Sequence, residues 1–169
     1  MRLLGAVMAL ISCGAMGFIY NRSLRERLDT LAAMYEVLAM MKVELSSRIC
    51  ALPELIETLS ERSKGEVSDF LLAVYKRLSS LGEYSFDELW CECAAKSLTA
   101  LNENERRAIC SLGSILGRGE LDAQIAEIDR CTSTLHTALE NARTEQPQQK
   151  KLTLGMSFAA GMLLVIMLI

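Results

Sequence analysis

The sequence contains little of what most enzymes use for catalysis. Among 169 residues there is one histidine, His136, and no nucleophile accompanies it at a useful spacing. No acid and base are paired at catalytic spacing either. The glycine-containing segment 112–120, LGSILGRGE, lacks the lysine and the serine or threonine that complete a phosphate-binding loop. We therefore predict that the protein is not an enzyme and uses no cofactor.

Cysteine spacing and charge exclude further classes of protein. The six cysteines follow no disulfide framework, and Cys91 and Cys93 form the one close pair, without the histidines or further cysteines of a metal site. The whole chain carries a net charge of −3, and Arg2 is the one charged residue outside 21–151, so that segment carries −4. It has no basic stripe for nucleic acid. We expect small, buried cysteines in a reducing compartment, no metal and no nucleic-acid partner.

Strand-like alternation of apolar and polar residues is also absent, and apolar residues recur every three or four positions instead. This period predicts six helices, over about 24–49, 53–59, 67–78, 85–98, 102–116 and 121–142. Ser85 with Glu88, and Asn102 with Glu105, are typical of capping boxes at helix starts. Short connections favour antiparallel neighbours, so the predicted fold class is an all-α antiparallel bundle.

Two prolines and one seam of apolar residues refine this prediction. Pro53, in the turn Leu52, Pro53 and Glu54, suits the first turn of the second helix. Pro147 is expected to interrupt the last helix. That helix repeats apolar residues at heptad spacing, which calls for a partner helix. The expected buried seam consists of Leu121, Ile125, Ile128, Leu135 and Leu139.

Two uncharged stretches, 3–20 and 152–169, stand at the ends of the chain. A helix of 18 residues spans about 27 Å, close to the thickness of the hydrocarbon layer of a bilayer. We predict transmembrane helices over 1–21 and 150–169 around a helical domain over 22–149. The basic residues Arg22, Arg25 and Arg27, with Lys150 and Lys151, place that domain in the cytoplasm by the positive-inside rule.

A lipoprotein signal is the alternative for the N-terminal stretch. The sequence from Leu10 to Cys13 is the kind of site at which a cysteine becomes lipidated. Cleavage there would leave Cys13 as the first residue of the mature protein and place the domain outside the cell. The apolar run continues past this site through Tyr20, which favours a retained helix over cleavage.

Four stretches of the chain resemble one known family. They are MRLLGA at 1–6, MMKVELSSRICALPEL at 40–55, LGSILGRGELDAQ at 112–124 and the closing anchor at 150–169. The third is the most specific, because Leu116, Gly117, Arg118 and Gln124 fall in register with the family motif, whereas Glu120 stands where the family usually has aspartate. Over essentially its whole length the chain resembles the stage III sporulation protein AB family of endospore-forming bacteria.

The resemblance implies a function that the residues alone do not give. Such proteins belong to a channel assembly in the membranes between mother cell and forespore, and their soluble domain is similar to the inner-membrane platform of type II secretion and type IV pilus machines. It implies a place in the mother-cell membrane and docking of a cytoplasmic ATPase, stage III sporulation protein AA. A generic membrane-anchored adaptor is the alternative, and self-association is left open.

The predicted docking surface is the turn between the fifth and sixth helices. It comprises Gly117, Arg118, Glu120 and Gln124. The arginine offers a rigid set of donors that suits bidentate pairing with a carboxylate of the partner. The other interpretation is that Arg118 pairs within the domain, with Glu120 or Asp122, and only pins the turn.

Overall fold

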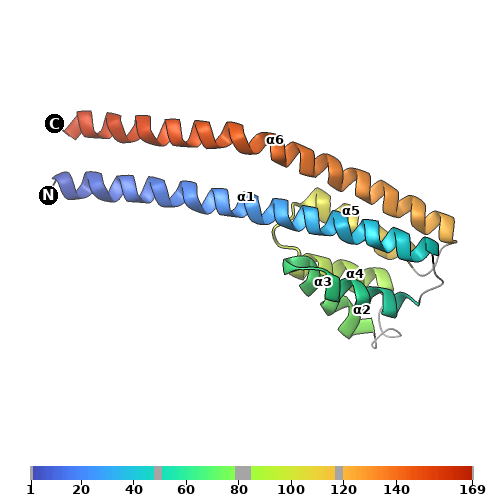
Figure 1. Cartoon of the computed structure of the whole chain (residues 1–169). Helices are drawn as coiled ribbons and strands as arrows, with labels where there is room; N and C mark the ends of the chain where they lie inside the picture. The colour runs from blue at the N-terminus through green and yellow to red at the C-terminus, as the bar shows by residue number, and fades with distance from the viewer. Residues whose placement is uncertain (1, 48–50, 79–84, 117–119, 169) are drawn as a thin grey trace. The chain divides into compact units, whose positions relative to one another are not determined.

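A computed structural model describes the backbone of residues 2–47, 51–78, 85–116 and 120–168, and the side chains of 22–47, 51–78, 85–116 and 120–144. Six helices follow one another in these ranges (Figure 1): α1 (Arg2–Ser47), α2 (Leu52–Arg62), α3 (Gly65–Arg77), α4 (Phe86–Ser97), α5 (Glu103–Ile115) and α6 (Leu121–Leu168). No strand occurs in the described backbone. The predicted all-α class and the number of helices are confirmed.

The chain divides into two compact units. One contains Met1–Glu26 and Glu140–Ile169, and the other contains Arg27–Leu139. Helices α1 and α6 contribute to both, because each is one continuous helix. The prediction that Pro147 interrupts the last helix was wrong: α6 continues through it to Leu168. Proline removes one backbone hydrogen bond, and long helical runs on both sides of it sustain the helix.

The predicted membrane spans fall outside the side chains that the structure describes. Within 22–47, 51–78, 85–116 and 120–144, no helix is long and apolar enough to cross a bilayer. The uncharged stretches 3–20 and 152–169 are not part of those ranges. Both transmembrane helices therefore stay predictions.

The starts of α2, α4 and α5 follow the local signals in the sequence. Pro53 lies in the first turn of α2, after Ala51 as the N-cap. Ser85 and Glu88 form the capping box of α4. At α5 the Asn102 side chain accepts a hydrogen bond from the Glu105 backbone N–H at 2.9 Å, and the Glu105 carboxylate accepts one from the Asn102 backbone N–H at 2.8 Å. These bonds satisfy N–H groups that a helix start would otherwise leave without partners.

Helices α2 to α5 pack in the order in which they follow along the chain, with α3 against α2, α4 against α3 and α5 against α4. Trp90 of α4 is at the centre of this packing. Its ring lies edge-on to Phe70 at 4.8 Å between centroids, and its Nε1 donates a hydrogen bond of 2.8 Å to the Ile109 carbonyl. Gly113 of α5 faces the same ring so closely that an added Cβ would lie 2.8–2.9 Å from Trp90 atoms.

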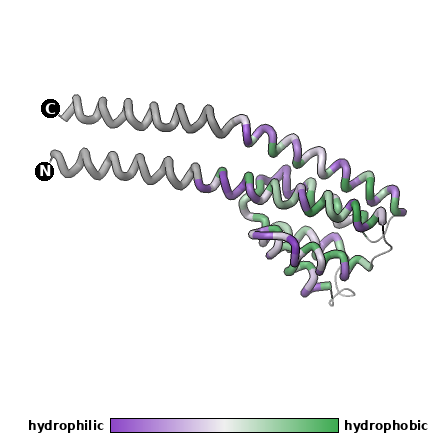
Figure 2. Tube along the Cα trace, in the orientation of Figure 1, coloured by the Kyte–Doolittle hydropathy of each residue, from purple (hydrophilic) through white to green (hydrophobic). Residues whose placement is uncertain are grey.

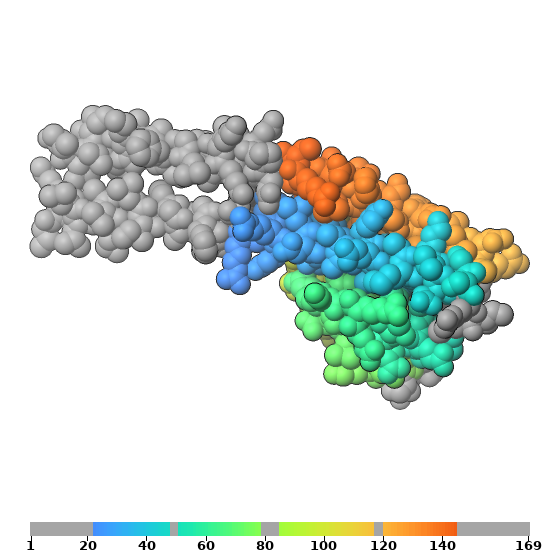
Figure 3. Space-filling view, in the orientation of Figure 1, coloured from blue at the N-terminus to red at the C-terminus, as the bar shows by residue number. Residues whose placement is uncertain are grey.

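Within the larger unit, the α1 segment is antiparallel to the α6 segment. Lys42 of α1 binds Asp129 of α6 at 2.5 Å. Tyr35, seven residues before Lys42, contacts His136, seven residues after Asp129, with 5.8 Å between the ring centroids. Figure 2 shows polar and apolar residues alternating along both segments, and Figure 3 shows the two lying along one another. The partner that the heptad spacing of α6 calls for is therefore α1.

The predicted seam of α6 is correct in its later part and wrong at its start. Ile128, Leu135 and Leu139 are buried, whereas Ile125 is half-buried and Leu121 is 46% exposed. In the register set by Lys42 with Asp129, Leu121 lies past Ser47, at which the described part of α1 ends. The buried set on these two helices also includes residues that the sequence analysis did not choose, namely Met34, Val37 and Met41.

Candidate functional site

The predicted docking surface lies partly within the described residues. Gly117 and Arg118 lie outside them. Glu120 is exposed directly before α6, and its carbonyl accepts a backbone hydrogen bond of 3.1 Å from Gln124, which is half-buried. Glu120 and Gln124 are thus one helical turn apart, as the spacing predicts. Both interpretations of Arg118 therefore stay predictions.

Leu121 adds an apolar centre to this surface. Its side chain is one of three large apolar side chains that are exposed in the described residues, with Val43 and Leu72. Glu120 and Asp122 stand on either side of it in sequence, and both are exposed. Protein interfaces commonly combine an apolar centre with a polar rim. The sequence analysis missed Leu121 because its heptad position is that of a core residue.

The start of α6 is held against α5 below this surface. Glu127 is 9% exposed, and its carboxylate accepts a hydrogen bond of 2.8 Å from the Ser111 hydroxyl of α5. Arg130 of α6 lies 3.7 Å from the other carboxylate oxygen. The surface around Leu121 is therefore carried by a helix that is fixed to its neighbour.

Helix α2 begins with the predicted turn of Leu52, Pro53 and Glu54, which belongs to the stretch 40–55 described above. Pro53 and Glu54 are exposed and Leu52 is half-buried. The backbone N–H of Leu55 donates to the Ala51 carbonyl at 3.1 Å, so this segment begins the helix. Its position explains the Leu-Pro-Glu pattern as a helix start, because proline suits the first turn, where its missing N–H has no intrahelical partner.

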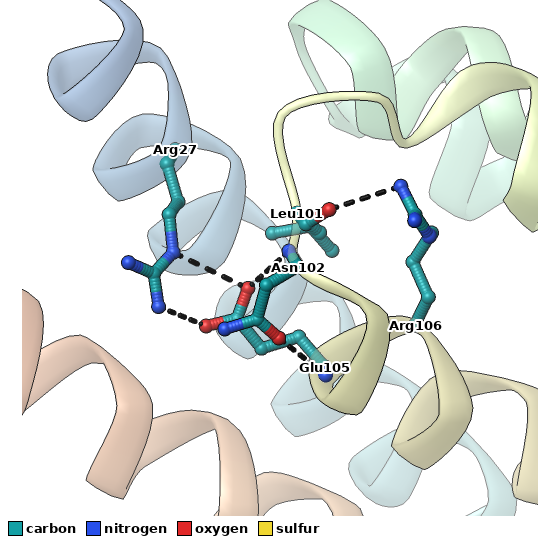
Figure 4. Close-up of polar contacts among 5 residues, drawn as sticks. All are labelled: Arg27, Leu101, Asn102, Glu105 and Arg106. Atoms are coloured by element: carbon teal, nitrogen blue, oxygen red, sulfur yellow. Dashed lines mark hydrogen bonds and ion pairs between the residues drawn. The ribbon is translucent and has the colours of Figure 1, made fainter. Parts of the chain in front are cut away.

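A buried ion pair connects α1 with the start of α5 (Figure 4). Arg27 donates to the two carboxylate oxygens of Glu105, from Nη2 at 2.6 Å and from Nε at 3.4 Å. The Glu105 side chain is 3% exposed, against 25% for Arg27. Arg106, next in sequence, donates to the Leu101 carbonyl at 3.0 Å. The capping box of Asn102 and Glu105 was predictable, whereas Arg27, 78 residues away, was not.

This cluster braces the fold and leaves no group for a ligand. Among the described side chains, every buried nitrogen and oxygen has a hydrogen-bond partner. Nor do three or more potential metal ligands come together in the same ranges. His136 is exposed beside Tyr35.

A three-residue ion network lies on the surface between α3 and α4. Glu92 binds Lys96 at 2.7 Å and Arg77 at 2.8 Å. The hydrogen bond from Lys96, followed by that from Arg77, lowers the pKa of Glu92 to about 2. All three side chains are at least one-third exposed, so solvent screens these pairs and they contribute little to stability.

The sequence matches the profile of the stage III sporulation protein AB family over residues 2–169. The chain belongs to this family. No curated protein and no solved structure shows a significant match to it.

Family membership gives the chain a role in sporulation, as a component of a complex with other proteins. The family is not a known enzyme family. The match covers both the sequence motif at 117–124 and the ion pair of Arg27 with Glu105. The two differ in chemistry, because the ion pair is closed and internally paired, whereas Glu120, Leu121 and Asp122 are exposed. Of the two, the exposed surface is the candidate for binding a protein partner.

Proposed function

We propose that this chain is a non-enzymatic platform component of a sporulation complex, anchored in the mother-cell membrane by both of its ends. Its helical unit lies in the cytoplasm and docks an ATPase, stage III sporulation protein AA. The observation that carries the proposal is the family match over residues 2–169, which includes both uncharged ends and the motif at 112–124. Both ends also belong to one compact unit.

Charge supports the orientation. Arg22 and Arg25 follow the first uncharged stretch, and both side chains are exposed at the start of the described region. Lys150 and Lys151 precede the second stretch. Basic residues beside membrane helices stay on the cytoplasmic side. A cytoplasmic helical unit is what contact with a cytoplasmic ATPase requires.

Exposure and chemistry support the docking surface. Leu121 offers an apolar contact, Glu120 and Asp122 offer carboxylates, and Arg118 is the one cation of the motif. Leu121 is 46% exposed, so a partner that covered it would gain about 1 kcal/mol or more from the area removed from water. Arginine is enriched among the residues that contribute most to protein interfaces. The described part of this patch has an apolar centre, Leu121, with an exposed carboxylate on either side in sequence.

Co-purification with the ATPase tests this surface. Leu121→Ser and Arg118→Ala should each reduce the amount of ATPase recovered with the full-length protein by about tenfold, since the loss of one central contact costs 1–2 kcal/mol of binding. The matched control is Leu72→Ser, because Leu72 is 39% exposed on α3 and lies outside the motif. It should leave recovery unchanged.

Melting temperature separates docking from an internal role. Reduced recovery at an unchanged melting temperature supports docking. If Arg118→Ala lowers the melting temperature, or if recovery survives both Leu121→Ser and Arg118→Ala, the motif pins the turn and does not dock the ATPase.

A further inference from the structure

Helices α4 and α5 approach each other unusually closely where they cross. An added Cβ on Gly113 would lie 2.9 Å from the Cβ of Trp90, so the two backbones are nearer there than two ordinary side chains allow. The hydrogen bond of 2.8 Å from Trp90 Nε1 to the Ile109 carbonyl fixes the same crossing one turn earlier on α5. Trp90 therefore lies between Ile109 and Gly113 on the neighbouring helix.

Two cysteines occupy this crossing. Cys91 directly follows Trp90, and Cys110 directly follows Ile109. Cys110 is the neighbouring side chain that contributes most to the raised pKa of Cys91, so the two thiols lie next to each other across the helices. A disulfide requires Cα atoms about 4.4–6.8 Å apart, so a small residue that lets two helices come together favours one. Gly113 supplies that close approach, within one helical turn of Cys110.

The other cysteines of the described region lie in different surroundings. Cys91 and Cys110 are half-buried, whereas Cys93 and Cys131 are buried. Cys93 lies beside Arg77, whose guanidinium is 3.9 Å from its sulfur. Cys91 and Cys93, the close pair in sequence, do not face each other, because residues two apart on a helix point in different directions. The pairing of Cys91 with Cys110 is therefore a property of the fold.

We propose that Cys91 and Cys110 form a dithiol site that closes to an intramolecular disulfide by exchange with a low-molecular-weight disulfide. One thiol, as its thiolate, attacks the small disulfide, which forms a mixed disulfide and releases one small thiol. The second cysteine then attacks the protein sulfur of that bond, which forms the Cys91–Cys110 bond and releases the second small thiol. The protein loses two hydrogens and two electrons, and the small disulfide gains them as two thiols.

The surroundings of Cys91 make closure of the disulfide slow. Burial, and then the hydrogen bond and charge of Cys110, raise the pKa of Cys91 to about 12, with a smaller contribution from Asp87. Few Cys91 thiolates exist at neutral pH, so closure is slow and needs an oxidant in excess. The site thus responds to a sustained change in the thiol–disulfide balance and stays open under reducing conditions.

The test uses the full-length protein in detergent with millimolar oxidised glutathione at pH 8. Peptide mapping by mass spectrometry without reduction should find a linked peptide pair that contains Cys91 and Cys110, two mass units lighter than the sum of its peptides. Dithiothreitol should remove the link. If both residues stay reduced or carry only glutathione, or if Cys91 links to Cys93, the proposal is wrong.

Single substitutions test the two steps separately. Cys91→Ser and Cys110→Ser should each abolish the link and leave a stable glutathione adduct on the remaining cysteine, because the second thiol is missing. Cys93→Ser is the matched control on the same helix and should leave the link in at least 80% of the yield of the unsubstituted protein. A link that persists in either Cys91→Ser or Cys110→Ser would show that another pair reacts.

Discussion

The Glu105 carboxylate accepts hydrogen bonds from two parts of the chain at once. The Asn102 backbone N–H donates to it at the start of α5, and Arg27 donates to it from α1. A buried carboxylate is costly unless its lone pairs are satisfied by charge or hydrogen bonds. Here the local bond begins a helix and the distant bond attaches that helix to α1.

Gly113 packs against Trp90 where α4 and α5 cross. Replacement by alanine normally stabilises a helix by up to about 1 kcal/mol. At this position the new methyl group would meet Trp90 at 2.8–2.9 Å. Trp90 is buried and donates a hydrogen bond to the Ile109 carbonyl, so moving the ring away would weaken that bond and the packing around it.

We therefore expect Gly113→Ala to lower the free energy of unfolding by about 1–3 kcal/mol, as overpacked core sites do. Ser114→Ala, at the exposed next residue of the same helix, is the control and should change it by less than about 0.5 kcal/mol. Urea unfolding of the full-length protein in detergent measures both. A stabilised Gly113→Ala variant would mean that α4 and α5 can separate at no cost.

At the scale of helices, α1 and α6 pair through charged contacts on the outside and apolar contacts within. Ile128 of α6 is fully buried in this pair, and His136, two turns later, is exposed against the Tyr35 ring. The two residues therefore differ in surroundings although they belong to one helix.

The alanine variants of these two residues should differ clearly in their free energy of unfolding. Ile128→Ala should cost about 2–5 kcal/mol, because it leaves a cavity in the core. His136→Ala should cost about 0.5 kcal/mol or less, because it removes only an exposed ring contact. Melting curves of the full-length variants measure the difference. Equal losses would mean that the faces of α6 are assigned incorrectly.

Helix starts and inward faces were largely predictable because they depend on neighbours in sequence. The capping boxes at Ser85 and Asn102 and the core positions of α3, such as Phe70 and Val74, follow from spacing alone. The exposure of Leu121 was not predictable in this way, since it depends on how the helices pack in space. The pairings of Arg27 with Glu105 and of Cys91 with Cys110 also required the fold, because their partners lie on different helices.

At the scale of the whole molecule, the orientation across the membrane is the property that the proposed function most depends on. Ser133 is exposed on α6, within the larger unit, and it is a suitable place for a reporter cysteine. A membrane-impermeant maleimide reaches such a cysteine in intact cells only if the unit lies on the outer side of the cell membrane.

We expect Ser133→Cys to remain unlabelled in sealed cells and to react fully once the membrane is opened, as the positive-inside rule requires. The buried Cys93 and Cys131 should react slowly in both conditions, so they serve as internal references. Labelling of Ser133→Cys in sealed cells would place the unit outside and favour the alternative in which Cys13 is lipidated.

The antiparallel pairing of α1 with α6 also governs the order in which the chain can fold during synthesis. Helices α2 to α5 contact their neighbours in sequence and can pack as they leave the ribosome. Lys42 must wait for Asp129, which is made 87 residues later, or about 4–17 s at ordinary rates of translation. A product truncated before Leu121 never completes this pair. Its α1 helix keeps an unpaired apolar face, so such fragments become substrates for chaperones and proteases.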